Sequence, residues 1–301
     1  PFPPQSQLSG YQGKIGKCLV YQKIFSLPKG LLKERFLLHF GAVDQIAEVW
    51  LNDICIGKHE GGYLPFTFDI TEQLNVTGEN NLKVVVWDDL YTNYPYGKQT
   101  NKRGGMWYTP VSGIWQNVWM ENVAEHYIKK LTLTPDMENI HIKLDMDTDG
   151  FSVTLSLHNG EVVKREFDKK EGTICLSDIK LDDGSNYEPQ NWTPDNPYLY
   201  NMTITTMGDK VETYFALRTI EIKEVNGVQR VLLNKKPIFL HGILDQGYFC
   251  DGLYLPAEER EEAIRYYESY FEEAGADVIF HPGCPMFYTD AAMLGAALEA
   301  A

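Results

Sequence analysis

Short runs of alternating apolar and polar residues fill the first 123 positions of the chain. The runs RFLLHF, AEVWL, FTFDI and LKVVVW are rich in β-branched and aromatic residues, and Gly, Asn and Asp separate them. This pattern is typical of β-strands. Both faces of LKVVVW are apolar, with Leu82, Val84 and Val86 on one and Val85 and Trp87 on the other. We therefore expect this strand to be buried between two layers.

A turn signal joins two of these runs. In AEVWLNDICIG the pair Asn52-Asp53 separates two short strands, and both residues tolerate positive φ, which favours a hairpin. With the neighbouring runs, it predicts a two-sheet β-sandwich domain over residues 1–124.

The alternation becomes cleaner from 125 to 223. The run IHIKLDM places four apolar side chains on its inner face, those of Ile140, Ile142, Leu144 and Met146. Asn159-Gly160 lies between two alternating runs, which is a strong hairpin signal, and Gly208-Asp209 repeats the arrangement. About seven short strands in roughly 100 residues predict an immunoglobulin-like β-sandwich domain over residues 125–223.

The pattern changes over residues 224–301. VLLN and PIFLHGI are predicted strands, residues 257–274 have an apolar stripe at helical spacing after Pro256, and ADVIF is a further predicted strand. The order strand, helix, strand indicates a parallel sheet. We expect these residues to form the first units of an incomplete parallel α/β domain.

Composition narrows the classes of partner. The chain has 301 residues, is 44% hydrophobic and 13% aromatic, and carries a formal net charge of −15. This charge argues against nucleic acid and against an anionic membrane as partners, because both need Lys and Arg for neutralisation. No apolar run approaches the ~20 residues of a membrane span. A neutral sugar fits an acidic, aromatic-rich surface; the alternative is that the acidity only aids solubility.

The cysteines bear on the compartment. Five cysteines lie far apart without metal-ligand spacing, so we expect reduced thiols and no metal site in this chain. This suits a cytoplasmic location of bacterial type. The chain opens with PFPPQ and no Met, which leaves secretion open.

Two acidic positions are candidates for a binding site. Asp88-Asp89 ends the strand LKVVVW and opens an irregular loop, where a carboxylate can bind sugar hydroxyls or a cation; the alternative is a turn cap. Asp245-Gln246 follows PIFLHGI, at the carboxyl edge of the predicted parallel sheet, where active sites of such domains collect; the alternative is a solvated loop. The chain contains no GxSxG, HExxH, P-loop or GxGxxG motif.

Several motifs resemble glycoside hydrolase family 2, which includes β-galactosidases, β-glucuronidases and β-mannosidases. HFGAVDQIAEVWLNDICIGKHEGGYLPFTFDIT and GKQ...WYTPVSGIWQNVWME resemble its sugar-binding jelly-roll domain. NPYLY and FALRTIEI resemble the end of its immunoglobulin-like domain. LLNKKPIFLHGILDQGY resembles the entry into its (β/α)8 barrel. The resemblance implies a mostly β fold: jelly roll, immunoglobulin-like sandwich, then the first barrel units.

The resemblance also implies a function. By this resemblance the chain is expected to be the amino-terminal part of a retaining exo-β-glycosidase similar to β-galactosidases. Such an enzyme hydrolyses terminal β-linked sugars. The family's two catalytic glutamates come from later barrel strands, so no residue of this chain receives a catalytic role and the chain alone is expected to be inactive. Asp88, Asp89, Asp245 and Gln246 are the expected substrate-binding residues. No cofactor is expected in this chain. Whether a full-length enzyme binds Mg²⁺ or Na⁺, and whether the protein forms a homo-oligomer, are left open. The alternative is a non-catalytic carbohydrate-binding or scaffold module.

Overall fold

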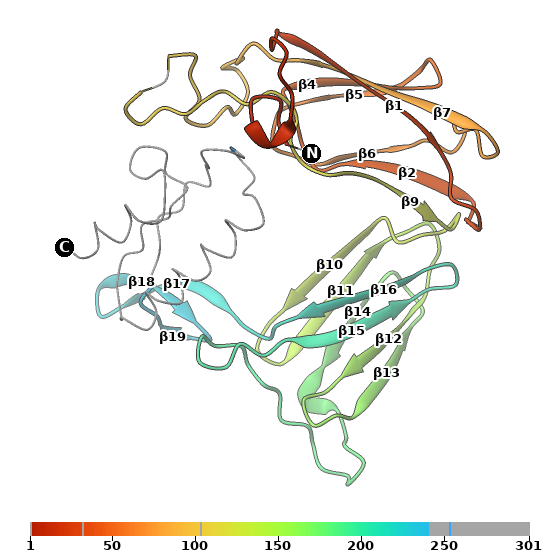
Figure 1. The fold of residues 1–301 in the computed structure, drawn as a ribbon. Helices are drawn as coiled ribbons and strands as arrows, with labels where there is room; N and C mark the ends of the chain where they lie inside the picture. Colours follow the sequence, from red (N-terminus) through yellow and green to blue (C-terminus); the bar gives the residue numbers. More distant parts are fainter. Residues whose placement is uncertain (1, 32, 103, 241–252, 254–301) are drawn as a thin grey trace. The chain divides into compact units, whose positions relative to one another are not determined.

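The structure, a computed structural model, describes residues 2–31, 33–102, 104–240 and 253. The described residues fall into two compact units, residues 2–122 with Leu253 and residues 123–240. Nearly all regular structure in the described residues is β-strand (Figure 1). The prediction of a mostly β fold is therefore confirmed for this part of the chain. The predicted helix at 257–274 and the barrel strand ADVIF lie outside the described residues.

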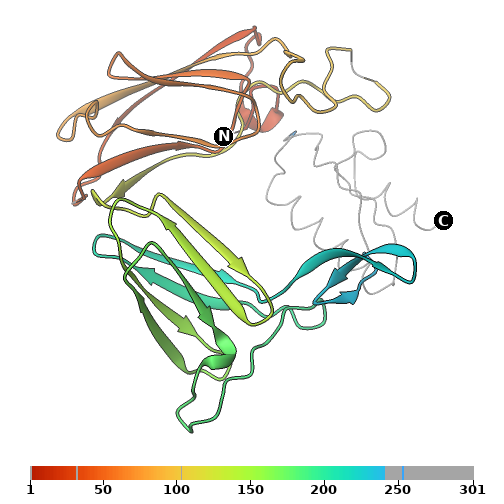
Figure 2. The ribbon, with the colours of Figure 1, turned by 180° about the vertical axis from the view of Figure 1, so that it is seen from behind.

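The first unit is a sandwich of two antiparallel sheets (Figures 1 and 2). One sheet has the order β1 (Cys18–Ser26), β7 (Glu79–Trp87), β4 (Ile46–Leu51) and β5 (Ile54–Glu60). The other has the order β6 (Phe66–Asp69), β2 (Arg35–Phe40) and β9 (Val118–Val123). A short ladder joins β3 (Val43–Asp44) to β8 (Gly113–Ile114), and a 3-10 turn, η1, covers Gln7–Ser9. This β3–β8 ladder positions the candidate site described below.

The predicted hairpin at Asn52-Asp53 is confirmed. The two residues have φ of 50° and 66° and connect β4 to β5. The alternation in β4 also holds, because Ala47, Val49 and Leu51 are fully buried in the core between the sheets.

The prediction that β7 is buried on both faces is wrong in part. Val84 and Val86 are buried in the core, whereas Val85 and Trp87 on the opposite face are only half-buried. The reason lies in the number of layers that cover β7. Among the described residues β7 lies in one sheet of a two-layer sandwich, so only one of its faces meets the other sheet.

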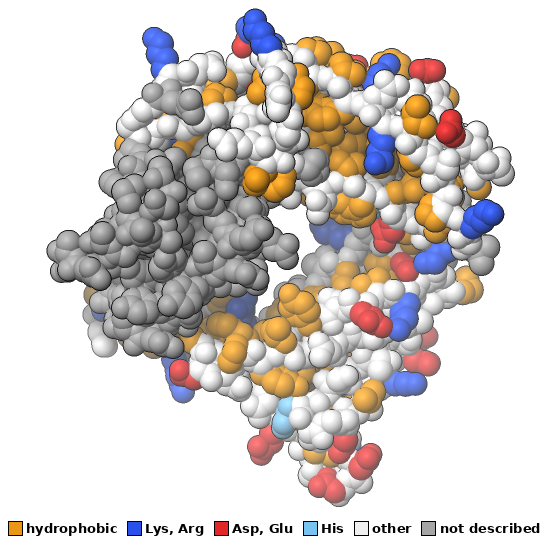
Figure 3. All heavy atoms as spheres, in the orientation of Figure 1, with side chains coloured by type: hydrophobic (Ala, Val, Ile, Leu, Met, Phe, Trp, Pro, Cys, Tyr) orange, Lys and Arg blue, Asp and Glu red, His pale blue; other side chains and the backbone are white. Residues whose placement is uncertain are grey.

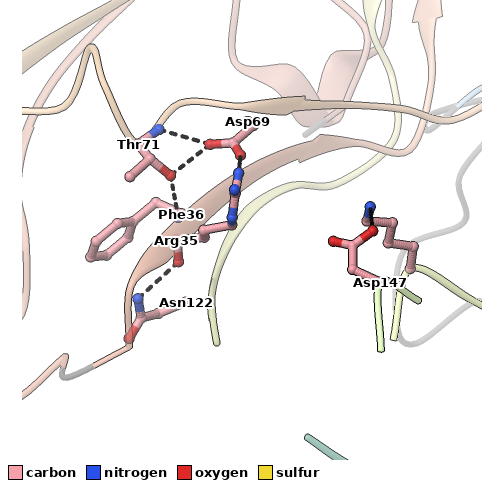
Figure 4. A network of polar contacts seen from close by, with 7 residues as sticks. Arg35, Phe36, Asp69, Thr71, Asn122 and Asp147 are labelled. Atoms are coloured by element: carbon pink, nitrogen blue, oxygen red, sulfur yellow. Dashed lines mark hydrogen bonds and ion pairs between the residues drawn. The ribbon is translucent and has the colours of Figure 1, made fainter. Parts of the chain in front are cut away.

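Polar contacts bind the three strands of the second sheet together at one end (Figure 4). Arg35 Nη1 donates to Asp69 Oδ2 at 2.7 Å, and Asn122 Nδ2 donates to the Arg35 carbonyl at 2.9 Å. Thr71 Oγ1 donates to Asp69 Oδ1 and accepts from the backbone N–H of Phe36. These contacts connect β2 to the segment after β6 and to β9, which fixes their register.

The second unit is a sandwich of one three-stranded and one four-stranded antiparallel sheet. The first has the order β10 (Lys130–Pro135), β11 (Asn139–Asp145) and β14 (Glu171–Cys175), and a 3-10 turn, η2, covers Leu176–Asp178. The second has the order β13 (Val162–Phe167), β12 (Phe151–Ser156), β15 (Tyr200–Thr205) and β16 (Lys210–Phe215).

The sequence pattern predicted this unit well. Hairpins join β12 to β13 and β15 to β16, as Asn159-Gly160 and Gly208-Asp209 indicated. The inner face of β11 is buried as expected, with Ile140 and Ile142 at 0% exposure. Tyr200 is also fully buried, and its ring stacks on Phe215. The core is thus filled from both sheets.

A third small sheet follows in the same unit, with β17 (Ile220–Val225), β18 (Val228–Leu233) and β19 (Lys236–Pro237). Asn226 and Gly227 both have positive φ and form the β17–β18 turn, as a two-residue hairpin requires. The predicted strand VLLN coincides with the end of β18 up to Leu233, and its last residue, Asn234, lies in the turn that follows. Lys223, the predicted domain boundary, lies inside β17, whereas the compact unit extends to Leu240.

Candidate functional site

Strand pairing brings three polar residues from distant segments to one end of the first sandwich. Asp44 ends β3 and lies opposite Gly113, directly after Ser112. Ile46 at the start of β4 lies opposite Trp87 at the end of β7, so Asp88 follows at the same edge. Asp44, Asp88, Ser112 and the nearby Gln99 are all buried, at 3%, 9%, 6% and 3% exposure. We call these four residues the Asp44–Asp88 cluster.

Asp88 is held in a fixed orientation. Its Oδ2 accepts from Ser112 Oγ at 2.6 Å, and its Oδ1 accepts from the Leu90 backbone N–H at 2.8 Å. Ser112 is itself clamped by Gln5, whose Oε1 accepts from the Ser112 N–H and whose Nε2 donates to Ser112 Oγ. A carboxylate with two donors in place is oriented before any ligand arrives.

Asp44 has an unusual protonation equilibrium. Its burial, together with the negative charge of Asp88, raises the pKa of the Asp44 carboxyl to about 7, although a hydrogen bond from Gln99 acts to lower it. Burial and a neighbouring negative charge both disfavour the ionised form of Asp44. At neutral pH, Asp44 is therefore present both as an acid that can donate and as a carboxylate that can accept.

Gln99 organises the glycine- and aromatic-rich loop that precedes β8. Its Oε1 accepts from the Val111 N–H at 2.5 Å, and its Nε2 donates to the Tyr96 carbonyl at 2.8 Å and to the Tyr63 hydroxyl at 3.2 Å. The backbone of Tyr108 pairs with Lys98 and Thr100 on either side of Gln99. The loop is thus folded back on itself around one buried amide.

The double glycine of HEGGYLP has a steric role at the cluster. A Cβ on Gly62 would lie 2.6 Å from Asp44 Oδ1, so only glycine fits this approach without a shift. The Gly62 carbonyl accepts from Trp115 Nε1 at 2.8 Å, and the Trp115 ring meets the edge of Tyr63. Aromatic rings therefore border the carboxylates, a combination suited to sugar hydroxyls and the apolar faces of sugar rings.

A second amide links the cluster to the loop after β7. Gln45, 1% exposed, donates from Nε2 to the Tyr91 carbonyl and accepts at Oε1 from the Tyr91 N–H, both at 3.1 Å. This pair fixes the chain just beyond Asp88 and Asp89. The geometry of the cluster thus depends on both loops that follow its strands.

The structure separates the predicted residues. Asp88 belongs to the cluster, whereas Asp89 forms an ion pair with Lys17 and its side chain is 37% exposed. Asp245 and Gln246 lie outside the described residues. The binding roles of these four residues stay predictions.

The sequence reasoning missed Asp44, Gln99 and Ser112. The signal for Asp44 was a carboxylate inside the apolar run AVDQIA, where a charged residue is uncommon without a partner or a function.

Among the residues that the structure describes, no three His, Cys, Asp or Glu side chains are grouped as a metal site requires. A search of the same residues for a long apolar helix of membrane-crossing length gave no candidate.

The fold and the cluster define a protein with two successive β-sandwiches, the first of which holds a buried acidic site. The model of the glycosyl hydrolases family 2 sugar binding domain matches residues 12–123, and that of glycosyl hydrolases family 2 matches residues 126–218. These matches cover more than half of the chain. The chain belongs to glycoside hydrolase family 2, and the cluster lies within the part matched by the sugar binding domain.

Curated relatives agree with this family. A β-galactosidase of Thermoanaerobacter pseudethanolicus is 27% identical over 248 residues, which cover 74% of this chain and 31% of the relative. A β-galactosidase of Thermoanaerobacterium thermosulfurigenes is 29% identical over 75% of this chain and 33% of its own length. A β-glucuronidase of Formosa agariphila is 24% identical over 74% of this chain and 25% of its own length. The chain thus spans a quarter to a third of these relatives.

Solved structures share the fold. The β-D-glucuronidase of Dictyoglomus thermophilum has a TM-score of 0.63 at 22% identity, over 84% of this chain and 45% of that one. A β-glucuronidase of an uncultured Clostridium species has a TM-score of 0.65 at 22% identity, over 94% of this chain and 53% of that one. This chain therefore shares its β-sandwich fold with these two structures.

Proposed function

We propose that this chain is the amino-terminal part of a retaining exo-β-glycosidase that hydrolyses terminal β-linked sugars, and that its Asp44–Asp88 cluster binds hydroxyls of the terminal sugar. The observation that carries the proposal is the convergence of two buried carboxyls inside the segment matched by the family's sugar binding domain. Carboxylates and amides fixed by other protein groups are typical of polyol recognition, because they accept hydrogen bonds in defined directions.

The chemistry of the cluster favours a neutral sugar. Its four members are either acidic or uncharged, so they suit the hydroxyls of a galactose-like sugar better than a second carboxylate such as that of a uronic acid. On the face seen in Figure 3, acidic and basic side chains of the described residues lie near one another at several places, and acidic ones gather at the lower tip. The β-galactosidases among the relatives support the same choice.

The cluster is a binding site and not the catalytic pair. Retaining glycosidases use two carboxyls about 5 Å apart, one as nucleophile and one as acid and base. Asp88 already accepts from Ser112 and Leu90, which holds it as an oriented acceptor. We assign both catalytic carboxyls to a part of the enzyme outside residues 2–240. The two sandwiches then position the sugar relative to those groups.

The test compares matched variants in the longest protein encoded by the reading frame that contains this chain. We expect hydrolysis of p-nitrophenyl β-galactoside to exceed that of the β-glucuronide. Asp88→Asn should lower kcat/KM by about 10- to 100-fold, because an oriented charged acceptor is lost. Asp145→Asn, which removes an exposed carboxylate of the second unit, is the control and should stay within about twofold.

Three results would overturn the proposal. A reading frame that ends at Ala301 would favour a non-catalytic carbohydrate-binding module. Turnover by the isolated 301-residue chain would contradict the assignment of catalysis to another part of the enzyme. Equal kinetics for Asp88→Asn and the unaltered enzyme would remove the cluster from the sugar site.

A further inference from the structure

The outer face of the four-stranded sheet in the second unit is hollowed. The hollow has a volume of about 320 Å³, and its lining comes from β12, β15 and β16, namely Thr154, Ser156, Asn201, Met202, Thr203, Glu212, Thr213 and Tyr214. This volume is in the range of pockets that hold small molecules. We call this hollow the β12–β15 groove.

The register of the strands explains why a groove forms on a sheet face. One row across the sheet is Thr154, Thr203 and Glu212, and in the neighbouring row Asn201 lies opposite Tyr214. The two central strands therefore carry short side chains, whereas the flanking strand β16 carries long ones. On the other side, β13 presents Val162, Lys164 and Glu166. The hollow lies over the short side chains of β12 and β15 and is bordered by the longer ones of β16.

The floor of the groove consists of unused hydrogen-bonding groups. The side-chain oxygens of Thr154, Ser156 and Thr203 make no hydrogen bond to another protein group among the described residues. Each hydroxyl can donate and accept. At one end, Tyr214 is 62% exposed and offers the face of an aromatic ring.

The borders of the groove are electrically balanced. Glu212 forms an ion pair with Lys210 at 2.7 Å, and this partner lowers the pKa of the Glu212 carboxyl. Across the sheet, Lys164 and Glu166 carry opposite charges on the same face of β13. The groove thus has no net charge to attract a polyanion.

We propose that the β12–β15 groove is a second carbohydrate-binding site, which holds an extended chain of neutral sugars. Ring stacking on Tyr214 and hydrogen bonds to the hydroxyl floor are the interactions such a chain uses. An added peptide strand is disfavoured at the floor, because β12 and β15 are inner strands that already pair with a neighbour on each side. The site lies in a different unit from the Asp44–Asp88 cluster and does not depend on the function proposed for it.

The experiment titrates the 301-residue chain with cellohexaose, xylohexaose and galactotetraose by calorimetry, with NMR of backbone amides to locate binding. We expect one of these oligosaccharides to bind and to shift the amides of β12, β15 and β16. Tyr214→Ala, and separately the shape-conserving pair Thr154→Val with Thr203→Val, should weaken binding about tenfold. Tyr11→Ala, which removes a tyrosine that is 50% exposed in the first unit, is the control and should bind normally.

The outcomes separate this proposal from the previous one. Binding that survives Asp88→Asn but is lost in Tyr214→Ala supports the groove, whatever the catalytic activity of the longer enzyme. Absence of binding to all of these oligosaccharides, or equal binding by Tyr214→Ala with its fold intact by circular dichroism, overturns it. Amide shifts in the groove that depend on protein concentration alone would assign the face to self-association and also overturn it.

Discussion

The two sandwiches differ in what they bury. The polar and charged residues that are buried as whole residues, among those the structure describes, all lie in the first unit: Ser6, Asp44, Gln45, Asn80, Asp88, Gln99 and Ser112. In the second unit, single polar atoms of the half-buried Asn191 and Thr219 are buried as well. The second unit fills its interior with apolar residues and with tyrosines that bond to each other, as Tyr187 does to Tyr200. Burying carboxyls is unfavourable for stability. The first unit thus buries carboxyls at one end of its core, whereas the charged side chains of the described part of the second unit lie at its surface.

The two ends of β7 sharpen this contrast within the first unit. At its start, Asn80 is 1% exposed and bonds to Asn52 and Asn75, a neutral network that closes the turns around it. At its end, Asp88 and Asp44 bring two carboxyls together. The network of Asn80, Asn52 and Asn75 contains no ionisable group, and its members bond to one another, so it explains itself as part of the fold.

The largest effect should come from the apolar core of the second unit. Leu155 is fully buried between the two sheets. Leu155→Ala removes contacts and leaves a cavity, which should lower the free energy of unfolding by about 2–5 kcal/mol. Denaturant unfolding of the 301-residue chain measures this. A loss below about 1 kcal/mol would show that this core is not packed as described.

Asp44→Asn should raise the free energy of unfolding rather than lower it, and the size of the gain should depend on pH. The folded-state pKa is raised from 3.8 to about 7, so the folded chain holds this proton more tightly than the unfolded chain. The contribution of the protonated Asp44 to the free energy of unfolding is fully present below about pH 4. It falls as the pH rises from about 4 to 7 and is lost above about pH 7. Asparagine does not ionise, so the variant should be more stable than the parent above pH 7, by about 2–4 kcal/mol.

Unfolding curves recorded between pH 4 and 8 test whether the free energy of unfolding changes with pH in this direction. The variant should lack the decline that the parent shows between pH 4 and 7. Asp89→Asn is the matched control, because Asp89 is partly exposed and should leave the shape of the profile unchanged. Identical profiles for Asp44→Asn and the parent would contradict the proximity of the two buried carboxyls.

Gly62→Ala should have an intermediate effect that is local to the cluster. The added Cβ would meet Asp44 Oδ1 at 2.6 Å, so the carboxyl must move. We expect a loss of about 1–3 kcal/mol in the free energy of unfolding, together with weaker binding of sugar at the proposed site. Gly61→Ala is a less suitable control because Gly61 has a φ of 105°. Gly16→Ala, whose nearest neighbour is at 3.9 Å, is the suitable one and should be nearly neutral.

The smallest effect should come from the exposed ion pair between Lys17 and Asp89. Both side chains are substantially exposed, and such pairs contribute little because water and salt screen them. Lys17→Ala should therefore leave the unfolding midpoint unchanged within error. A clear destabilisation would show that Asp89 supports the cluster through its neighbour Asp88.

Local rules predicted much of the fold. The turns at Asn52-Asp53 and Asn159-Gly160, and the inward face of Ile140 and Ile142, all follow from residue spacing. These features depend on neighbours in sequence, through φ preferences and the two-residue period of a strand. The half-buried outer face of β7 did not follow, because Val85 and Trp87 are as apolar as core residues and only the number of layers decides their burial.

The candidate site was predicted only in part for the same reason. Asp88-Asp89 was singled out as one unit, but adjacent residues at a strand end point to different sides. Their surroundings, Ser112 for Asp88 and Lys17 for Asp89, come from segments 24 and 72 residues away. No spacing rule connects such segments.

The sequence by itself therefore determined the two sandwiches, their hairpins and the family to which the chain belongs, because period, turn residues and motifs are local properties. Tertiary structure alone decided that Asp44 meets Asp88 in a buried site and that Asp89 faces water. It also decided that short side chains on β12 and β15 lie between longer ones to form a groove. The physical reason is that burial, pKa and groove shape depend on which strands pair across the sheet, and pairing joins residues that are far apart in the chain.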